Sequence, residues 1–124
     1  MLLVDDEKDF VDTLSKRLLA RDYSVAVAYS GPQALALAAQ EAPDLMILDL
    51  RMPGMDGIEV LGRLRELRCE VEVIMLTGHG GAEEERAARA LGAFEYLQKP
   101  ADIGQLVDTM QRAYAKLIAG RSSR

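Results

Sequence analysis

The sequence predicts a single α/β domain built on one doubly wound, five-stranded parallel sheet with five helices covering its two faces. The first observation is a strict alternation of short apolar runs with amphipathic stretches, joined by short connections. The second is the nearly continuous apolar run at residues 44–48, which is typical of a strand buried on both faces. The third is the length of 124 residues, which suits one domain rather than two.

The expected strands are short and apolar, and turn formers or charged residues bound them. Residues 2–4 (LLV) are followed at once by two aspartates, and residues 24–29 (SVAVAY) contain β-branched side chains that favour strands. The predicted strands are Leu2–Val4, Ser24–Tyr29, Asp44–Leu48, Val71–Leu76 and Phe94–Gln98.

The expected helices carry apolar residues at three- and four-residue steps. In the first helix this pattern is formed by Phe10, Val11, Leu14 and Leu18, and Ser30 is a suitable N-cap for the second helix. The predicted helices span residues 7–21, 31–40, 58–67 and 83–91, and the last begins near residue 102. The last helix has one apolar stripe, made of Ile103, Leu106, Val107, Met110, Tyr114 and Leu117.

The composition excludes several classes of protein. Hydrophobic residues make up 49% and charged residues 28%, a globular balance, and no apolar run approaches the roughly 20 residues of a membrane helix. The N-terminus turns acidic after four residues, unlike a signal peptide, and the single Cys69 excludes an internal disulfide. A net charge of −5 argues against direct nucleic-acid binding. We therefore expect a cytoplasmic domain at residues 1–119 that binds no membrane, with a flexible tail or linker start at 120–124.

Chemistry-bearing side chains follow the strands at the points where they end. Asp5 and Asp6 follow the first strand, Asp49 the third, Thr77 ends the fourth and Lys99 the fifth. Ligands of open parallel sheets bind beyond the carboxyl ends of the strands, so these groups are expected to converge. Clustered carboxylates repel one another, and a hard divalent cation removes that repulsion. Oxygen ligands with room for water favour Mg²⁺.

Each of these residues also has an ordinary structural interpretation. Asp6 could cap the first helix, Asp49 could cap a turn, Thr77 could be a plain strand end, and Lys99 could be a solvated edge lysine. Taken singly, each structural role is the better interpretation. A shared site is favoured because all four residues fall at the same end of the predicted strands.

Four segments together resemble the receiver domains of two-component response regulators. They are Val4–Glu7 (VDDE), Leu48–Gly57 (LDLRMPGMDG), Met75–Gly78 (MLTG), and Gly92-Ala93 through Lys99-Pro100. The resemblance covers essentially the whole chain, and this combination of motifs is highly specific. It implies a flavodoxin-like sheet of the chemotaxis-receiver type, with strand order 2-1-3-4-5.

The resemblance also implies a role for each site residue. Asp49 would accept a phosphoryl group from a sensor histidine kinase or a phosphotransfer protein. Asp6 would bind Mg²⁺ directly and Asp5 mainly through water, and Asp49 and the backbone carbonyl of Arg51 would complete the protein ligands. Lys99 would pair with the phosphoryl oxygens. The domain would promote its own phosphorylation and slow dephosphorylation without being a turnover enzyme.

A conformational switch is implied in the same way. The Thr77 hydroxyl would hydrogen-bond the attached phosphoryl group, and Tyr96 would occupy the aromatic switch position. Arg51 and His79 lie at positions that tune the lifetime of the phosphoryl bond, although for His79 a solvated loop side chain is the better interpretation. The Lys99–Pro100 peptide bond is expected to be cis.

The output surface is expected on the fourth helix, the last strand and the last helix. It would include Arg86, Arg89, Glu95 and the exposed side of Ile103–Gln111. Its partner would be a downstream protein or a C-terminal output domain absent from the 124 residues, and a phosphorylation-dependent homodimer stays open.

Two other functions are compatible with such a fold. A phosphorylation-independent interaction module would not need Asp6, Asp49, Thr77 and Lys99 together. A flavodoxin-type cofactor binder would need a phosphate-cradling loop after the first strand, where this chain has acids, and stacking aromatics, of which it has only 5%.

Overall fold

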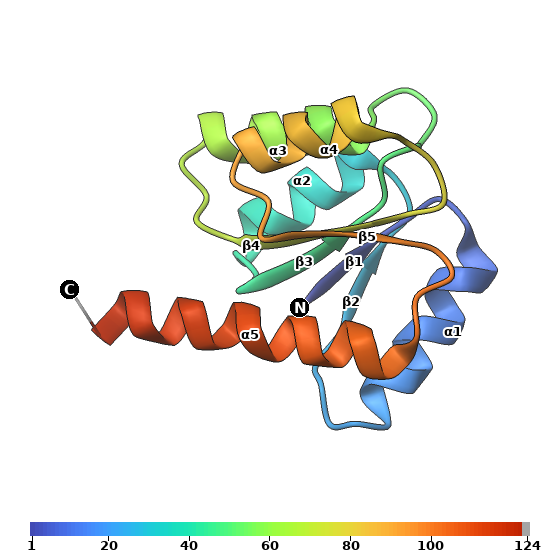
Figure 1. The fold of residues 1–124 in the computed structure, drawn as a ribbon, viewed down its shortest axis with the longest axis vertical. Helices are drawn as coiled ribbons and strands as arrows, with labels where there is room; N and C mark the ends of the chain where they lie inside the picture. The colour runs from blue at the N-terminus through green and yellow to red at the C-terminus, as the bar shows by residue number, and fades with distance from the viewer. Residues whose placement is uncertain (123–124) are drawn as a thin grey trace.

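The computed structural model describes residues 1–122, and within them five parallel strands form one sheet in the order β2-β1-β3-β4-β5 (Figure 1). Both the parallel sheet and its predicted strand order are confirmed. The strands are β1 (Leu2–Val4), β2 (Ala26–Ala28), β3 (Leu45–Leu48), β4 (Glu72–Thr77) and β5 (Glu95–Gln98). The helices are α1 (Lys8–Leu19), α2 (Gly31–Gln40), α3 (Gly57–Glu66), α4 (Ala82–Ala90) and α5 (Ile103–Ser122).

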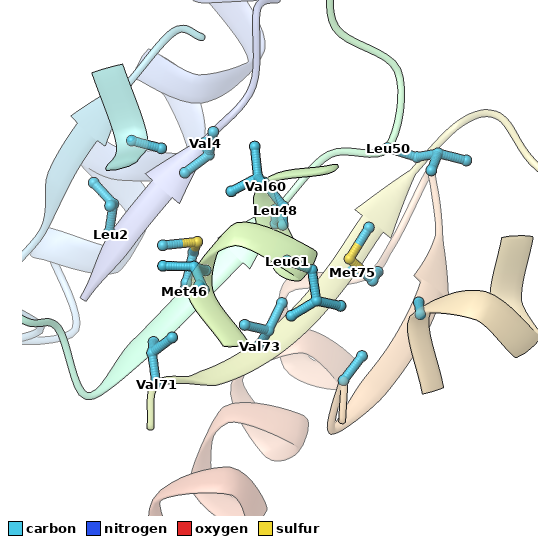
Figure 2. Packing of buried hydrophobic residues seen from close by; sticks show 14 of the residues in the cluster. Leu2, Val4, Met46, Leu48, Leu50, Val60, Leu61, Val71, Val73 and Met75 are labelled. Carbon is cyan, nitrogen blue, oxygen red and sulfur yellow. The ribbon is translucent and has the colours of Figure 1, made fainter. Parts of the chain in front are cut away.

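The helices form two layers, with α1 and α5 on one face of the sheet and α2, α3 and α4 on the other (Figure 1). Successive side chains of a strand point to opposite faces, and the core divides accordingly. Leu2, Val4, Met46, Leu48, Val73 and Met75 pack against α2, α3 and α4, and Figure 2 shows them with Val60 and Leu61. Leu3, Ile47, Ile74 and Leu76 face α1 and α5 instead.

This two-sided burial explains why the strands read as continuous apolar runs. All four residues of β3 are buried, whereas β2 lies at the sheet edge and only its last residue, Ala28, is buried. The prediction of a strand at residues 24–29 was correspondingly too long. An edge strand pairs on one side only, and Ala26 pairs with Leu2 at the first position of β1.

Local capping sets the starts of several helices. The Ser30 hydroxyl accepts a hydrogen bond from the backbone N–H of Gln33 at 3.2 Å, as expected, and the Asp56 carboxylate accepts one from Glu59 at 2.9 Å. The N-cap position of α1 is Glu7, so the interpretation of Asp6 as the cap of that helix is wrong. Asp6 therefore does not cap α1.

The last helix extends further than the predicted domain boundary. α5 continues through Ser122, so residues 120–122 of the expected tail are helical, and residues 123–124 lie outside the described part of the chain. The apolar stripe of α5 is confirmed where the helix covers the sheet, because Leu106 and Met110 are fully buried. None of the helices in residues 1–122 is long and apolar enough to cross a membrane.

One arginine organises the end of the sheet where the strands begin. The guanidinium of Arg65 donates to the carbonyls of Leu91 (2.8 Å), Cys69 (2.9 Å), Val71 (3.0 Å) and Gly92 (3.2 Å). A single side chain thus joins the end of α3 to the loop before β4 and to the turn after α4. A guanidinium carries five N–H donors in a fixed fork, so it can bind several carbonyls at once.

Candidate functional site

The sheet brings the predicted site residues to one edge. The backbone N–H of Asp49 donates to the carbonyl of Val4 at 2.9 Å, which places the end of β3 beside the end of β1. The backbone N–H of Lys99 donates to the carbonyl of Thr77, also at 2.9 Å, which places the residue after β5 beside the end of β4. The convergence expected for a parallel sheet is therefore confirmed.

Three carboxylates form the centre of this edge. Asp5, Asp6 and Asp49 each offer an oxygen within 4.8 Å of the others. Asp5 and Asp49 are only 3% and 2% exposed, whereas Asp6 is exposed to solvent. The two buried carboxylates of Asp5 and Asp49 and the exposed carboxylate of Asp6 form a set of hard oxygen donors, which is open to water on the side of Asp6. This chemistry fits a hard divalent cation that keeps some of its waters.

The electrostatics of Asp49 reflect its surroundings. Burial raises the pKa of its carboxyl, and the negative charge of Asp5 raises it further. The Thr77 hydroxyl, the Lys99 ammonium and the backbone N–H of Leu50, which donates to Asp49 Oδ1 at 2.9 Å, oppose this rise without cancelling it. The ionised form of Asp49 is therefore more basic than an ordinary aspartate.

Lys99 lies beside the carboxylates but is bound on the side of α1. Its Nζ donates to Asp5 Oδ2 at 2.7 Å and to Glu7 Oε1 at 3.2 Å, and it lies 4.1 Å from the centre of the Phe10 ring. Burial alone would lower the pKa of Lys99, but the hydrogen bond and charge of Asp5, helped by Asp49 and Glu7, raise it. Lys99 is therefore charged at neutral pH.

Sequence reasoning missed Glu7 and Phe10 as members of the site. Their signal was present, because Glu7 directly follows the acidic pair and Phe10 lies three residues later on the same helix. Residues three apart at the start of a helix lie on one face, so Glu7 and Phe10 can contact the same group, here the Lys99 ammonium.

The Thr77 hydroxyl and the Tyr96 ring meet at the loop that follows β4. Thr77 is fully buried, and its Oγ1 accepts a hydrogen bond from the backbone N–H of His79 at 3.1 Å. The hydroxyl of Tyr96 donates to the backbone carbonyl of the same His79 at 3.3 Å. Gly80 has a φ of +97°, and a Cβ on this residue would collide with the Tyr96 hydroxyl and the Leu50 side chain. The ring of Tyr96 therefore packs closely against this loop.

The two remaining predicted site residues lie outside the carboxylate cluster. Arg51 and His79 both have exposed side chains. Backbone N–H groups, chiefly that of Gly81, lower the pKa of Glu84, and the charge of Arg51 contributes to the same effect. Arg51 thus lies close enough to the start of α4 to influence a charge there. The Lys99–Pro100 peptide bond is cis, as expected.

Comparisons with known proteins agree with this geometry. A family model described as the response regulator receiver domain matches residues 1–111. Sporulation initiation phosphotransferase F of Bacillus subtilis is 34% identical over 112 residues, which cover 90% of each protein. Transcriptional regulatory protein GlrR of Escherichia coli is 37% identical over 113 residues, which are 91% of this chain but only 26% of that protein. The chain thus spans about a quarter of the length of that regulator.

The solved structures give the same result at the level of the backbone. Chemotaxis protein CheY4 of Vibrio cholerae superposes with a TM-score of 0.84 at 32% identity, over 90% of this chain and 95% of that one. Receiver domains of response regulators are signalling domains, and the three aspartates, the threonine and the lysine at one sheet edge are the features by which the sequence resembles them. The chain belongs to the response regulator receiver domain family.

Proposed function

We propose that this domain accepts a phosphoryl group on Asp49 from a sensor histidine kinase or a phosphotransfer protein, and that the modification changes its surface for a downstream partner. The observation that carries the proposal is the cluster of Asp5, Asp6 and Asp49, with oxygens within 4.8 Å of one another and Asp49 buried among them. Such a cluster is electrostatically unfavourable without a cation, and it is well placed to bind one.

We propose Mg²⁺ as that cation. Asp6, Asp5, Asp49 and the backbone carbonyl of Arg51 would hold it, with water in the remaining positions. When bound, Mg²⁺ offsets the negative charge of the phosphoryl oxygens. The exposed position of Asp6 and the buried positions of the other two carboxylates leave one side of the cluster open for the incoming group.

The residues of the chain supply the rest of the chemistry. The N–H of Leu50 holds Asp49 Oδ1, which leaves Oδ2 as the attacking oxygen. The Oδ2–P bond forms as the P–N bond to the donor imidazole breaks, and that imidazole takes up a proton from water. The raised pKa of Asp49 makes it a better nucleophile, and the Lys99 ammonium neutralises charge on the transferred group.

We propose that the switch passes through Thr77 and Tyr96. The Thr77 hydroxyl accepts from the N–H of His79 at 3.1 Å, and as it turns its own O–H toward the phosphoryl group it would carry that N–H with it. The loop then moves, and Tyr96 moves with it because its hydroxyl is bound to the carbonyl of His79. The change would reach the surface of α4, β5 and α5, where Arg89 bridges Glu85 at 3.0 Å and Glu95 at 2.6 Å.

Further parts of the proposal concern lifetime and partners. Arg51 follows Asp49 by two residues and His79 follows Thr77 by two, and we propose that their side chains tune how fast water removes the phosphoryl group. The output partner would be a separate protein or a C-terminal output domain, since some relatives, such as the transcriptional regulator GlrR, are much longer than this chain. A phosphorylation-dependent homodimer through the same surface is compatible with either. We place the domain in the cytoplasm, where such a kinase and the unpaired Cys69 would be expected.

The test is the intact mass of the protein after incubation with acetyl phosphate, with and without Mg²⁺. We expect one Mg²⁺-dependent phosphoryl adduct in the wild type and none in Asp49→Asn. Thr77→Ala should still form the adduct but should lack the chemical-shift changes at Arg86, Arg89 and Glu95 that the wild type shows on phosphorylation. Absence of any wild-type adduct would favour a phosphorylation-independent interaction module instead.

A further inference from the structure

We infer that Glu7 is a positioning residue that holds the Lys99 ammonium on the α1 side of the site, in competition with the phosphoryl group. The inference rests on the proposed function, because Lys99 is the group that would neutralise the transferred phosphoryl group at Asp49. Glu7 is not one of the three aspartates, the threonine and the lysine that define the site.

The contacts of the ammonium carry the argument. An ammonium has three N–H donors, and here one is bound by Asp5 at 2.7 Å and a second by Glu7 at 3.2 Å. The face of the Phe10 ring lies 4.1 Å from the same nitrogen, which is a favourable distance for a cation on an aromatic ring. All three partners lie on β1–α1, and no ion pair within 4.0 Å joins Lys99 to Asp49 in the described chain.

Glu7 differs from Asp5 in burial and in how firmly the fold fixes its side chain. Asp5 is buried, and its second oxygen accepts the backbone N–H of Glu7 at 2.9 Å, so its position is fixed by the fold. The side chain of Glu7 is 61% exposed, and within residues 1–122 its one ion pair is with Lys99. Truncating it therefore leaves no cavity, and the backbone that starts α1 stays bound through the carbonyl of Glu7, which accepts from Val11. A variant at Glu7 should fold normally.

The physical consequence is a competition for one cation. Because Asp5 and Glu7 hold two of its three donors on the α1 side, binding to a phosphoryl oxygen on Asp49 would draw Lys99 from Glu7 toward the acceptor and away from the ring face of Phe10. An exposed ion pair is weak, so the effect of losing it should be about two- to five-fold in rate. Phosphorylation should therefore become faster, not slower, when the contact of Glu7 is removed.

The kinetic test measures the rate of adduct formation on Asp49 with acetyl phosphate at saturating Mg²⁺. Glu7→Gln removes the charge and with it the ion pair, Glu7→Asp keeps the charge but shortens the reach, and Asp9→Asn removes a nearby exposed charge that makes no ion pair with Lys99. We expect both Glu7 variants to react about two- to five-fold faster than the wild type and Asp9→Asn to match it. A wild-type rate in Glu7→Asp, or equal acceleration in Asp9→Asn, would mean that net charge alone acts and would overturn the inference.

A spectroscopic test needs no phosphorylation. The Phe10 ring should shift the Hε protons of Lys99 upfield, and Phe10→Leu gives the value without the ring. In Glu7→Gln and Glu7→Asp we expect these protons to move part of the way toward that value, while Asp9→Asn leaves them unchanged. Unmoved Hε protons in both Glu7 variants would refute the positioning role. If the wild type forms no phosphoryl adduct, the proposed function fails, yet this measurement still decides the position of Lys99.

Discussion

Gly57, the first residue of α3, lies against the backbone of the acceptor residue. A Cβ on Gly57 would lie 3.0 Å from the carbonyl carbon of Asp49 and from the Cα of Leu50, and closer still to the Asp49 carbonyl oxygen. The N–H of Gly57 also donates to the carbonyl of Leu50 at 2.7 Å. The start of α3 is thus seated directly on the turn that presents Asp49.

The cost of Gly57→Ala follows from these distances. Ordinary contact for a Cβ begins near 3.4 Å, and the atoms in the way are backbone atoms that no side-chain rotation can move. The helix must move by about 1 Å, and overpacking of this kind typically costs about 1–3 kcal/mol. The better helix propensity of alanine returns at most about 1 kcal/mol. We expect a net loss of about 1–2 kcal/mol in the free energy of unfolding.

Gly62 provides a matched control in the same helix. A Cβ on Gly62 has no neighbour within 4 Å, so Gly62→Ala should gain about 0.5–1 kcal/mol from helix propensity alone. Urea denaturation followed by circular dichroism measures both variants. Gly57→Ala should also slow phosphorylation of Asp49, since the acceptor turn is displaced. Equal stability of the two alanine variants would refute the reasoning, because only the clash distinguishes them.

Three further predictions follow from other contacts. In a chelating buffer at pH 7, Asp49→Asn should raise the free energy of unfolding, because the buried carboxyl has a raised pKa and its ionised form destabilises the folded state. This gain should fade as the pH falls through that pKa, since the wild-type carboxyl is then neutral as well. Added Mg²⁺ should raise the Tm of the wild type only. Glu95→Gln should instead lower the free energy of unfolding. Burial raises the pKa of Glu95, but the Tyr96 N–H and Arg89 lower it by more, so the ionised carboxylate stabilises the folded state. Urea titrations should therefore show a loss of at most about 1 kcal/mol at pH 7, which vanishes below the pKa of Glu95 in the folded protein. Arg65→Lys should lower the free energy of unfolding by about 2 kcal/mol, because an ammonium cannot replace the guanidinium fork that binds four carbonyls. Amide hydrogen exchange should also become faster at the turn after α4. A loss of stability under about 0.5 kcal/mol would contradict this reasoning.

The layered fold could be predicted because its signals are local. Runs such as Leu45–Leu48 are buried on both sides and carry no polar interruption, and the amphipathic helices have clear stripes. The extent of β2 was overestimated because strand propensity does not show whether a strand lies at the edge. The strand order came from the family resemblance, since nothing in alternation alone distinguishes one order of parallel strands from another.

The carboxylates of the site could be predicted because parallel strands present their carboxyl ends together. The partners of Lys99 could not, because its 2.7 Å contact with Asp5 joins residues 94 positions apart and requires the side chain after β5 to reach past the ends of β4 and β3 to the end of β1. Sequence reasoning assigned Lys99 to the phosphoryl group and left its resting contacts unspecified. The role of Arg65 was missed for a related reason: its acceptors are backbone carbonyls, which carry no sequence signature.

The four hydrogen bonds of Arg65 have a mechanical consequence for α4. Two of them, to the carbonyls of Leu91 and Gly92, hold the end of this helix, whereas its beginning follows a loop containing Gly78, Gly80 and Gly81. A displacement of α4 should therefore be a rotation about its fixed end rather than a translation. For the nine residues of α4, about 13 Å of helix, a rotation of about 10° moves the first turn by about 2 Å. A partner that contacts the first turn of α4 would then detect a change that a partner at its last turn would not.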